Sequence, residues 1–269
     1  MVEGLAHFMQ AMVRERQEGR KSAIAYLQQF RSGLAEAEKQ GRTPAEKDAA
    51  PVTAAATAGA QANQSPAGKV ASAAVPAPPP AAAPANPVAP GADAPPLPEG
   101  QPLIRATDDV YYRSKALFVW WMLRDMLGDE ALQGALHQYR VADDREPSYL
   151  QRIVESSAHR QMEWFFDDWI YRDRGLPDFR IEAVNARSLL PEGVTVSVTV
   201  VNDGDAGAEV PVIVPTSGGD ALQRVLVPAH GKVTTRLNAA AIPNEVRVND
   251  GSVPESDTGN NSFTVKREP

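Results

Sequence analysis

The sequence predicts a multidomain α + β protein with two helical regions, a Pro/Ala-rich insertion between them and a β-sandwich at the C-terminal end. Apolar residues recur every three to four positions near the start of the chain and again over 108–171, which is the period of an amphipathic helix. Residues 43–102 hold 14 of the 23 prolines. After Phe179 the apolar period changes to two, the period of a strand. We therefore divide the chain into residues 1–42, 43–105, 106–178 and 179–269.

Composition excludes several classes of function. The chain has 269 residues, no Cys and a formal net charge of −7. The absence of Cys rules out a disulfide scaffold, a thiolate metal site and a Cys nucleophile. A nucleic-acid-binding protein needs a basic face, so the negative charge argues against one. No apolar run approaches the roughly 18 residues of a membrane-spanning helix, so we expect no transmembrane segment in this chain.

The first helical region reads as a hairpin of two helices. Residues 3–18 carry one apolar stripe, Gly19 is a break, and Ser22 is placed to cap a second helix. The stripe consists of Leu5, Phe8, Met9 and Met12, at helical spacing.

The Pro/Ala-rich stretch differs in kind from its surroundings. No aromatic residue occurs between Phe30 and Tyr111. Such a composition cannot bury enough apolar surface to offset the entropy lost on ordering, and Pro-rich chain acts as a semi-stiff spacer. We expect residues 43–105 to form a disordered linker or inserted loop.

The second helical region contains a series of shorter helices. The pattern predicts a helix from Asp108 to Leu127, after which Gly128 suits a left-handed terminating position and Asp129 caps the next helix. Another helix opens at Pro147-Ser148. A last helix, 162–171, carries Trp164, Phe165, Phe166 and Trp169, which we expect in the core.

The C-terminal region reads as seven short strands. Val194, Val196, Val198 and Val200 alternate with polar residues, and Asn202-Asp203-Gly204 follows as a turn. Seven strands with regular turn signals over about 90 residues fit an immunoglobulin-like β-sandwich without the antibody disulfide. Because a polar turn at 173–178 precedes the strands, we expect 179–269 to fold by itself. The expected strands are at about 179–184, 194–200, 208–215, 222–227, 232–238, 244–249 and 262–266.

No self-contained catalytic motif is present. The four histidines are never four residues apart, so the chain has no HExxH zinc pair, and it lacks a nucleophile elbow, a P-loop and a dinucleotide fingerprint.

The remaining motifs resemble the aminopeptidase N-like gluzincin zinc metallopeptidases. Residues 3–8 read EGLAHF, similar to that family's N-E-G-x-A-x-[FY] segment. Residues 111–116 (YYRSKA) followed by 122–129 (MLRDMLGD) resemble its Y-x-K-G-A…M-L-R-x-x-L-G helix. Residues 164–171 (WFFDDWIY) followed by 175–177 (GLP) resemble its W-F-x-x-W-x-x-x-x-G-x-P element. The resemblance implies that the helical regions are the C-terminal part of a gluzincin catalytic domain.

The resemblance also implies roles for particular residues. Glu3 matches the family's third zinc ligand, so Zn²⁺ is the implied cofactor and a peptide the implied substrate. The family's oxyanion-binding Tyr precedes a Lys-Gly pair. Aligning Lys115 with the family Lys puts Arg113 at the Tyr position, so Tyr112 is the first candidate and Tyr111 the second. His7, four residues after Glu3, is not a ligand position in the family and is interpreted as a packing residue.

The resemblance is incomplete because the family's HExxH helix lies just under twenty residues before the E-G motif, and only two residues precede Glu3 here. This chain therefore holds one implied zinc ligand of three, and by itself we expect neither tight zinc binding nor peptide hydrolysis. Three interpretations stay open: a fragment of a longer metallopeptidase, a non-catalytic helical plus β-sandwich binding module, or one half of a split enzyme whose HExxH half is a separate chain. Pro/Ala spacers and appended β-sandwiches favour a periplasmic, extracellular or membrane-anchored location.

Overall fold

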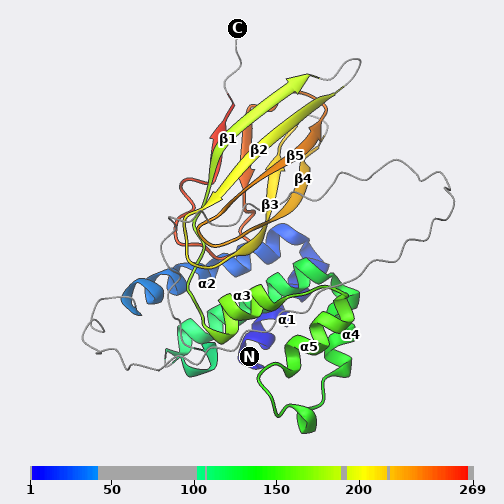
Figure 1. Ribbon diagram of the computed structural model, residues 1–269, viewed down its shortest axis with the longest axis vertical. Helices are drawn as coiled ribbons and strands as arrows, with labels where there is room; N and C mark the ends of the chain where they lie inside the picture. The colour runs from blue at the N-terminus through cyan, green and yellow to red at the C-terminus, as the bar shows by residue number, and fades with distance from the viewer. Residues whose placement is uncertain (1, 42–101, 107, 189–192, 217–218, 266–269) are drawn as a thin grey trace, which may run out of the picture. The chain divides into compact units, whose positions relative to one another are not determined.

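The computed structural model describes residues 2–41, 102–106, 108–188, 193–216 and 219–265, which belong to one compact unit (Figure 1). The side chain of Glu3 is also outside this description. The expected insertion lies outside the described residues up to position 101. Its last residues have regular structure: Leu103–Arg105 form a 3₁₀ helix, η1, and Leu103 is buried. Leu103–Arg105 were predicted to belong to the insertion, whereas they form a helical turn because the apolar side chain of Leu103 packs in the core.

The chain begins with two helices joined by one glycine. Helix α1 spans Val2–Glu18 and helix α2 spans Arg20–Gly41. Gly19 between them has φ 87°, a left-handed conformation that glycine adopts without steric cost. The predicted break is confirmed, but α2 begins two residues before Ser22, the residue expected to cap it.

The apolar stripe of α1 is only partly buried. Phe8 and Met12 lie in the core, whereas Met9 is 54% exposed. The expectation of one continuous stripe was thus too broad, because the neighbouring helices cover only part of its width.

Two further helices follow in close succession. Helix α3 spans Asp109–Leu127 and helix α4 spans Asp129–Gln138. Gly128 between them ends α3 as predicted, and its N–H donates to the carbonyl of Arg124 at 2.8 Å. Its φ of 81° and ψ of 163° are a conformation that favours glycine, although not the left-handed helical one that the sequence predicted. Asp129 is the first residue of α4 instead of its cap.

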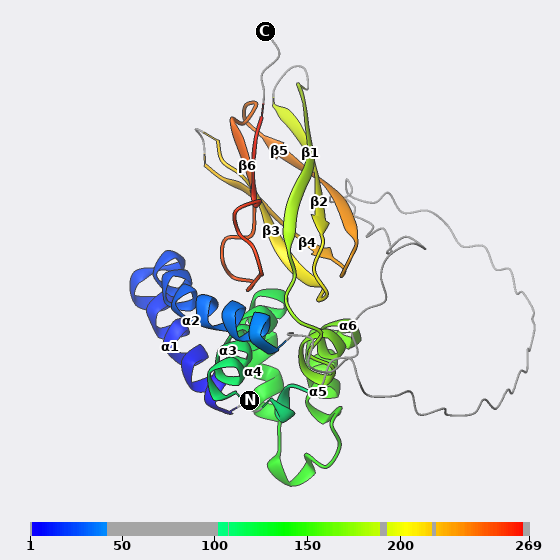
Figure 2. The same cartoon turned by 90° about the vertical axis from the view of Figure 1, so that its left-hand side faces the viewer.

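Helices α1 and α3 lie side by side and run in the same direction (Figure 2). Phe8 on α1 contacts Trp121 on α3 with ring centroids 6.5 Å apart. Further along both helices, Glu15 forms an ion pair with Arg124. The order of these contacts shows that both helices begin at the same end.

The helical region ends in short elements. Helix α5 spans Tyr149–Ala158, a 3₁₀ helix η2 spans Val141–Asp143, and α6 spans only Glu163–Phe166. The chain then widens into a π-helical turn, η3, at Asp167–Tyr171, where one continuous helix had been expected. The predicted aromatic core is confirmed for Phe165, Phe166 and Trp169, which are buried, while Trp164 is half-buried.

The strands form two antiparallel sheets, as the period of two predicts (Figure 1). The first has the order β1-β2-β5 and the second the order β4-β3-β6-β7. Strand β2 alternates buried valines with half-buried polar residues over most of its length. The strands are β1 Phe179–Ser188, β2 Val194–Asn202, β3 Ala208–Val214, β4 Ala221–Val227, β5 Lys232–Ala239, β6 Glu245–Val248 and β7 Ser262–Thr264.

The chain is therefore a mixed α and β protein, as predicted. Valines from both sheets, including Val198 of β2 and Val212 of β3, belong to the same buried core as the helical aromatics. Ion pairs also join the helices to the strand region: Arg20 pairs with Asp125 and with Asp250, and Arg224 of β4 pairs with Asp125. Over the described residues, no helix is both long and apolar enough to cross a membrane.

Candidate functional site

The starts of α1 and α3 are held together by a close backbone approach at Gly4. A Cβ atom at Gly4 would lie 2.3 Å from the Cβ of Ala116 and 2.6 Å from its carbonyl carbon. Real Cβ atoms do not approach that closely, so only glycine fits. The small pair Gly4 and Ala116, both within the motifs that the sequence analysis singled out, thus sets the spacing of the two helices.

This contact brings the backbones of the sequence-predicted site residues to one end of the helix pair. Glu3 precedes Gly4 in the first turn of α1. Tyr111 and Tyr112 lie in the first turn of α3, one turn before Ala116. The side chain of Glu3 lies outside the described part, so its role as a zinc ligand stays a prediction.

The hydroxyl of Tyr111 is fully engaged by neighbouring side chains. It donates to the carboxylate of Asp173 at 2.9 Å and accepts from Nζ of Lys115 at 3.0 Å. Lys115 is completely buried, forms an ion pair with Asp173, and donates to the carbonyl of Gly175 at 3.0 Å. The ammonium also lies 5.2 Å from the ring centre of Trp169. Tyr111 therefore belongs to a buried polar cluster that fixes the start of α3 to the turn after η3.

Tyr112 has a different environment. It lines a cavity of about 500 Å³, and within the described part of the chain its hydroxyl makes no hydrogen bond. Of the two candidate tyrosines, Tyr112 is thus the one whose hydroxyl is available to a ligand. The other lining residues are Pro102, Leu103, Ile104, Arg105, Asp144, Pro147, Leu150, Phe166, Ile170 and Tyr171.

The second tyrosine of this cavity, Tyr171, has its hydroxyl bound within the protein. It donates to Oε1 of Gln151 at 2.9 Å and lies 3.2 Å from the carbonyl of Pro147. Burial raises the pKa of the Tyr171 hydroxyl above its usual value near 10, and Glu155 adds to the effect. Tyr171 therefore stays protonated at neutral pH and serves as a fixed part of the wall.

His7 makes packing and hydrogen-bond contacts with α2. Its ring lies 5.0 Å from that of Phe30, and its Nδ1 is 3.0 Å from the hydroxyl of Tyr26. The same hydroxyl donates to Gln10 at 2.5 Å. These contacts account for His7 without a metal.

The described residues alone do not make a metal centre. They contain no group of three or more His, Asp or Glu side chains arranged to hold an ion. A zinc site needs at least three protein ligands, so this part of the chain does not fit zinc by itself.

The sequence analysis missed the partners of Lys115. It treated Lys115 as a motif position on a helix and 173–178 as a connecting turn. The signal available was a lysine inside an apolar run, because a buried lysine needs a nearby acid. Asp173, which has φ 44°, supplies that acid from 58 positions further along the chain.

Comparison with known proteins gives little further information. No protein-family model matches the chain, and no curated protein matches it. Among solved structures, it is similar to DesR, a β-glucosidase from Streptomyces venezuelae in complex with D-glucose, with 17% identity and a TM-score of 0.23. That alignment covers 38% of this chain and 17% of the β-glucosidase. At such a score the similarity carries no argument about fold or function.

Proposed function

We propose that this chain is the C-terminal part of a zinc-dependent metallopeptidase of the aminopeptidase type, which hydrolyses peptide bonds with a zinc-activated water. The observation that carries the proposal is the contact between Gly4 and Ala116. It joins two motif segments that lie more than a hundred residues apart and places Glu3 and Tyr112 in adjoining first turns. A chance similarity in amino-acid sequence would give no reason for these two segments to be in contact.

Zinc would be held jointly with residues outside this chain. Glu3 is the one ligand proposed here, and a gluzincin site needs two imidazoles in addition. Bound zinc would supply a hydroxide at neutral pH. The proposed contribution of this chain is one carboxylate and the positioning of the peptide.

Tyr112 is proposed to act on the peptide carbonyl. As the carbonyl becomes tetrahedral its oxygen gains negative charge, and a preorganised O–H donor stabilises that charge more than it stabilises the substrate. The unengaged hydroxyl of Tyr112 at a cavity suits this task. The hydroxyl of Tyr111 does not, because Asp173 and Lys115 already bind it.

The sheets are proposed to form an immunoglobulin-like sandwich appended to the catalytic domain. Seven antiparallel strands divided between a sheet of β1, β2 and β5 and a sheet of β3, β4, β6 and β7 support that class. Residues 43–105 are proposed to be a Pro/Ala-rich insertion within the helical region.

The direct test is to supply the missing ligands. The DNA upstream of this reading frame is sequenced. Any HExxH-bearing polypeptide encoded there is then produced either fused to the N-terminus of this chain or as a separate chain in the same cells. Zinc content after dialysis and hydrolysis of aminoacyl anilides are then measured. One bound zinc and turnover that a chelator abolishes support the proposal. A separate HExxH chain that restores both indicates a split enzyme, and the absence of any HExxH partner favours the non-catalytic binding module.

A further inference from the structure

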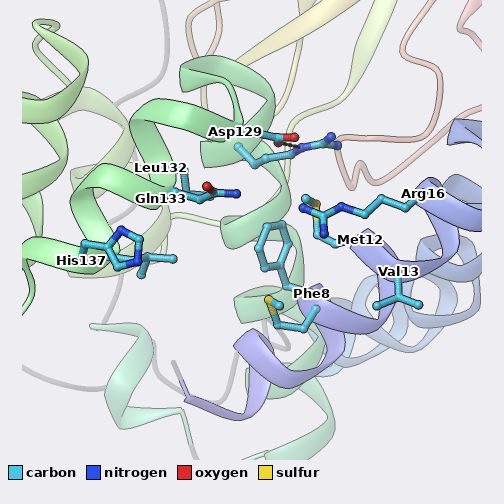
Figure 3. A pocket seen from close by; sticks show the side chains of 11 residues that line it. Phe8, Met12, Val13, Arg16, Asp129, Leu132, Gln133 and His137 are labelled. Atoms are coloured by element: carbon cyan, nitrogen blue, oxygen red, sulfur yellow. Dashed lines mark hydrogen bonds and ion pairs between the residues drawn. The ribbon is translucent and has the colours of Figure 1, made fainter.

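A groove lies between α1 and α4, further along α1 than the first turn that carries the proposed peptidase site (Figure 3). It encloses about 300 Å³, at the lower end of the range for small-molecule pockets, which is about 300–1,000 Å³. Side chains of α1 form one wall and those of α4 the other, and Arg124 of α3 also lines the groove. The lining residues are Phe8, Met9, Met12, Val13, Arg16, Arg124, Asp129, Leu132, Gln133, Leu136 and His137.

The groove is apolar along most of its length. Phe8, Met12 and Leu132 are buried in its floor. On the rim, Met9 and Val13 are 54% and 48% exposed and lie one turn apart on the same face of α1. Exposed apolar side chains that continue a buried floor are typical of a binding groove, and methionine adapts its shape to different occupants.

One cation of the groove, Arg16, attracts the carboxylate of Asp129 without forming an ion pair with it. Figure 3 shows the side chain of Arg16 reaching from α1 into the groove toward α4. Within the described part of the chain Arg16 forms no ion pair. Arg124, by contrast, is paired with both Glu15 and Asp129. The groove therefore combines apolar walls with one guanidinium whose nearest acidic neighbour, Asp129, is already bound by Arg124.

Two other ionisable groups that line the groove are Asp129 and His137. The carboxylate of Asp129 faces the same end of the groove, where the hydrogen bond from Arg124 and, to a smaller extent, the charge of Arg16 lower its pKa. His137 lies toward the opposite end, on α4 (Figure 3). Glu15 and Asp129 both bind Arg124, so Arg16 is the guanidinium of the groove that makes no direct contact with a carboxylate among the described residues.

We propose that this groove binds a linear alkyl carboxylate, with the chain between α1 and α4 and the carboxylate on Arg16. A neutral lipid would leave the guanidinium without a partner, and a small anion without a tail would leave the apolar walls in water. A carboxylate matches the planar fork of arginine in a bidentate manner. The proposal is independent of peptidase activity, because it uses no residue of the proposed catalytic site.

Titration calorimetry of the full chain with decanoate, below the concentration at which decanoate forms micelles, tests the proposal. Saturable binding with one site is expected, and it should weaken as salt increases because the contact with Arg16 is exposed and screened. Acetate, which has the head without the tail, should not bind. Octyl glucoside, which has a tail without the charge, should bind at least about tenfold more weakly, the change expected from one lost charge-assisted contact.

Variants identify the groove as the site. Arg16→Gln should raise the Kd for decanoate by about tenfold, and Val13→Glu, which places a negative charge on the rim, should abolish binding. Arg14→Gln is the matched control, because Arg14 lies on the same helix but stacks on the ring of Tyr26 at 5.0 Å and does not line the groove. Circular dichroism verifies that each variant folds.

Several results would overturn the proposal. These are equal affinity for decanoate and octyl glucoside, equal effects of Arg16→Gln and Arg14→Gln, and no binding of decanoate by the folded chain. Tight binding of an amphipathic peptide helix that decanoate does not displace would assign the groove to a protein partner instead.

Discussion

The hydroxyl of Tyr111 and the carboxylate of Asp173 are 2.9 Å apart, although 62 positions separate the two residues in the chain. Nζ of Lys115 contacts both groups, so three polar side chains share one largely enclosed space at the start of α3. The first turn of that helix also carries Tyr112. The cluster therefore determines where the proposed oxyanion donor stands relative to the rest of the molecule.

Lys115→Met is expected to destabilise the protein by about 3–5 kcal/mol. The change leaves Asp173, whose side chain is 10% exposed, without its cation, and an unpaired buried charge is costly. Asp173→Asn tolerates φ 44° because asparagine adopts left-handed conformations readily. The double variant should be more stable than the sum of the single changes predicts, as measured by urea unfolding. Strict additivity would show that the pair does not interact.

Gly4→Ala is expected to destabilise the chain by about 1–3 kcal/mol, the usual cost of overpacking, because the new methyl group meets Ala116 at 2.3 Å. Gly134→Ala on α4 is the matched control, since a Cβ there meets no atom within 4 Å. That change should stabilise the protein by about 0.5–1 kcal/mol through helix propensity. Thermal melts of the two variants give the comparison, and shifts of the same sign would contradict it.

Glu255 makes stability depend on pH. It is fully buried and accepts hydrogen bonds from Asn249 and Asn261 at 2.5 Å, yet burial raises its pKa from 4.5 to about 7. The folded state then holds a proton that the unfolded state releases. This contribution to stability is complete below pH 4.5 and is lost as the pH rises through 7, with a total of about 3 kcal/mol.

Replacing this carboxyl by an amide removes the titration. Glu255→Gln should flatten the pH dependence of the unfolding free energy between pH 4.5 and 8, relative to the unmodified protein. Denaturant titrations at several pH values measure this difference. Parallel curves for the two proteins would show that Glu255 titrates alike in the folded and unfolded states.

If the proposed peptidase is assembled with an HExxH-bearing part, Tyr112→Phe is expected to lower kcat by about 10²–10³ without changing zinc content, because it removes the proposed oxyanion donor. Glu3→Gln should lower zinc affinity, because it removes the charge of the proposed ligand while keeping its shape. Zinc analysis and steady-state kinetics separate the two effects. Loss of kcat on Tyr111→Phe with a silent Tyr112→Phe would move the catalytic role to the preceding residue.

Periodicity was sufficient to predict the main elements of the fold. The 3.6-residue period located α1 and α3, the two-residue period located β2, and Gly128 marked the end of a helix by the conformation that only glycine adopts cheaply. Periodicity reports how one element is covered, but not which other element covers it. For that reason the sequence did not predict that Met9 is exposed or that Leu103–Arg105 form a 3₁₀ turn.

The candidate site was predictable as a set of motifs, whereas its geometry was not. The spacing of Gly4 and Ala116 and the pairing of Lys115 with Asp173 depend on contacts between distant segments. Arg16 was equally hidden, because a charged residue on an amphipathic helix looks the same in sequence whether or not it has a counter-ion.

Both backbone polar groups of Gly207, which belong to two successive peptide units, are hydrogen-bonded to side chains of η3. Its N–H donates to Asp168 at 2.9 Å, and its carbonyl accepts from Nε1 of the buried Trp169 at 2.8 Å. A fragment starting at 179 would leave both groups of Gly207 without these partners. A pulling force on β3, which begins at the next residue, would accordingly pass into η3 through hydrogen bonds to two successive peptide planes. Force on the sheets is therefore carried to the helices by these hydrogen bonds as well as by the covalent connection between η3 and β1.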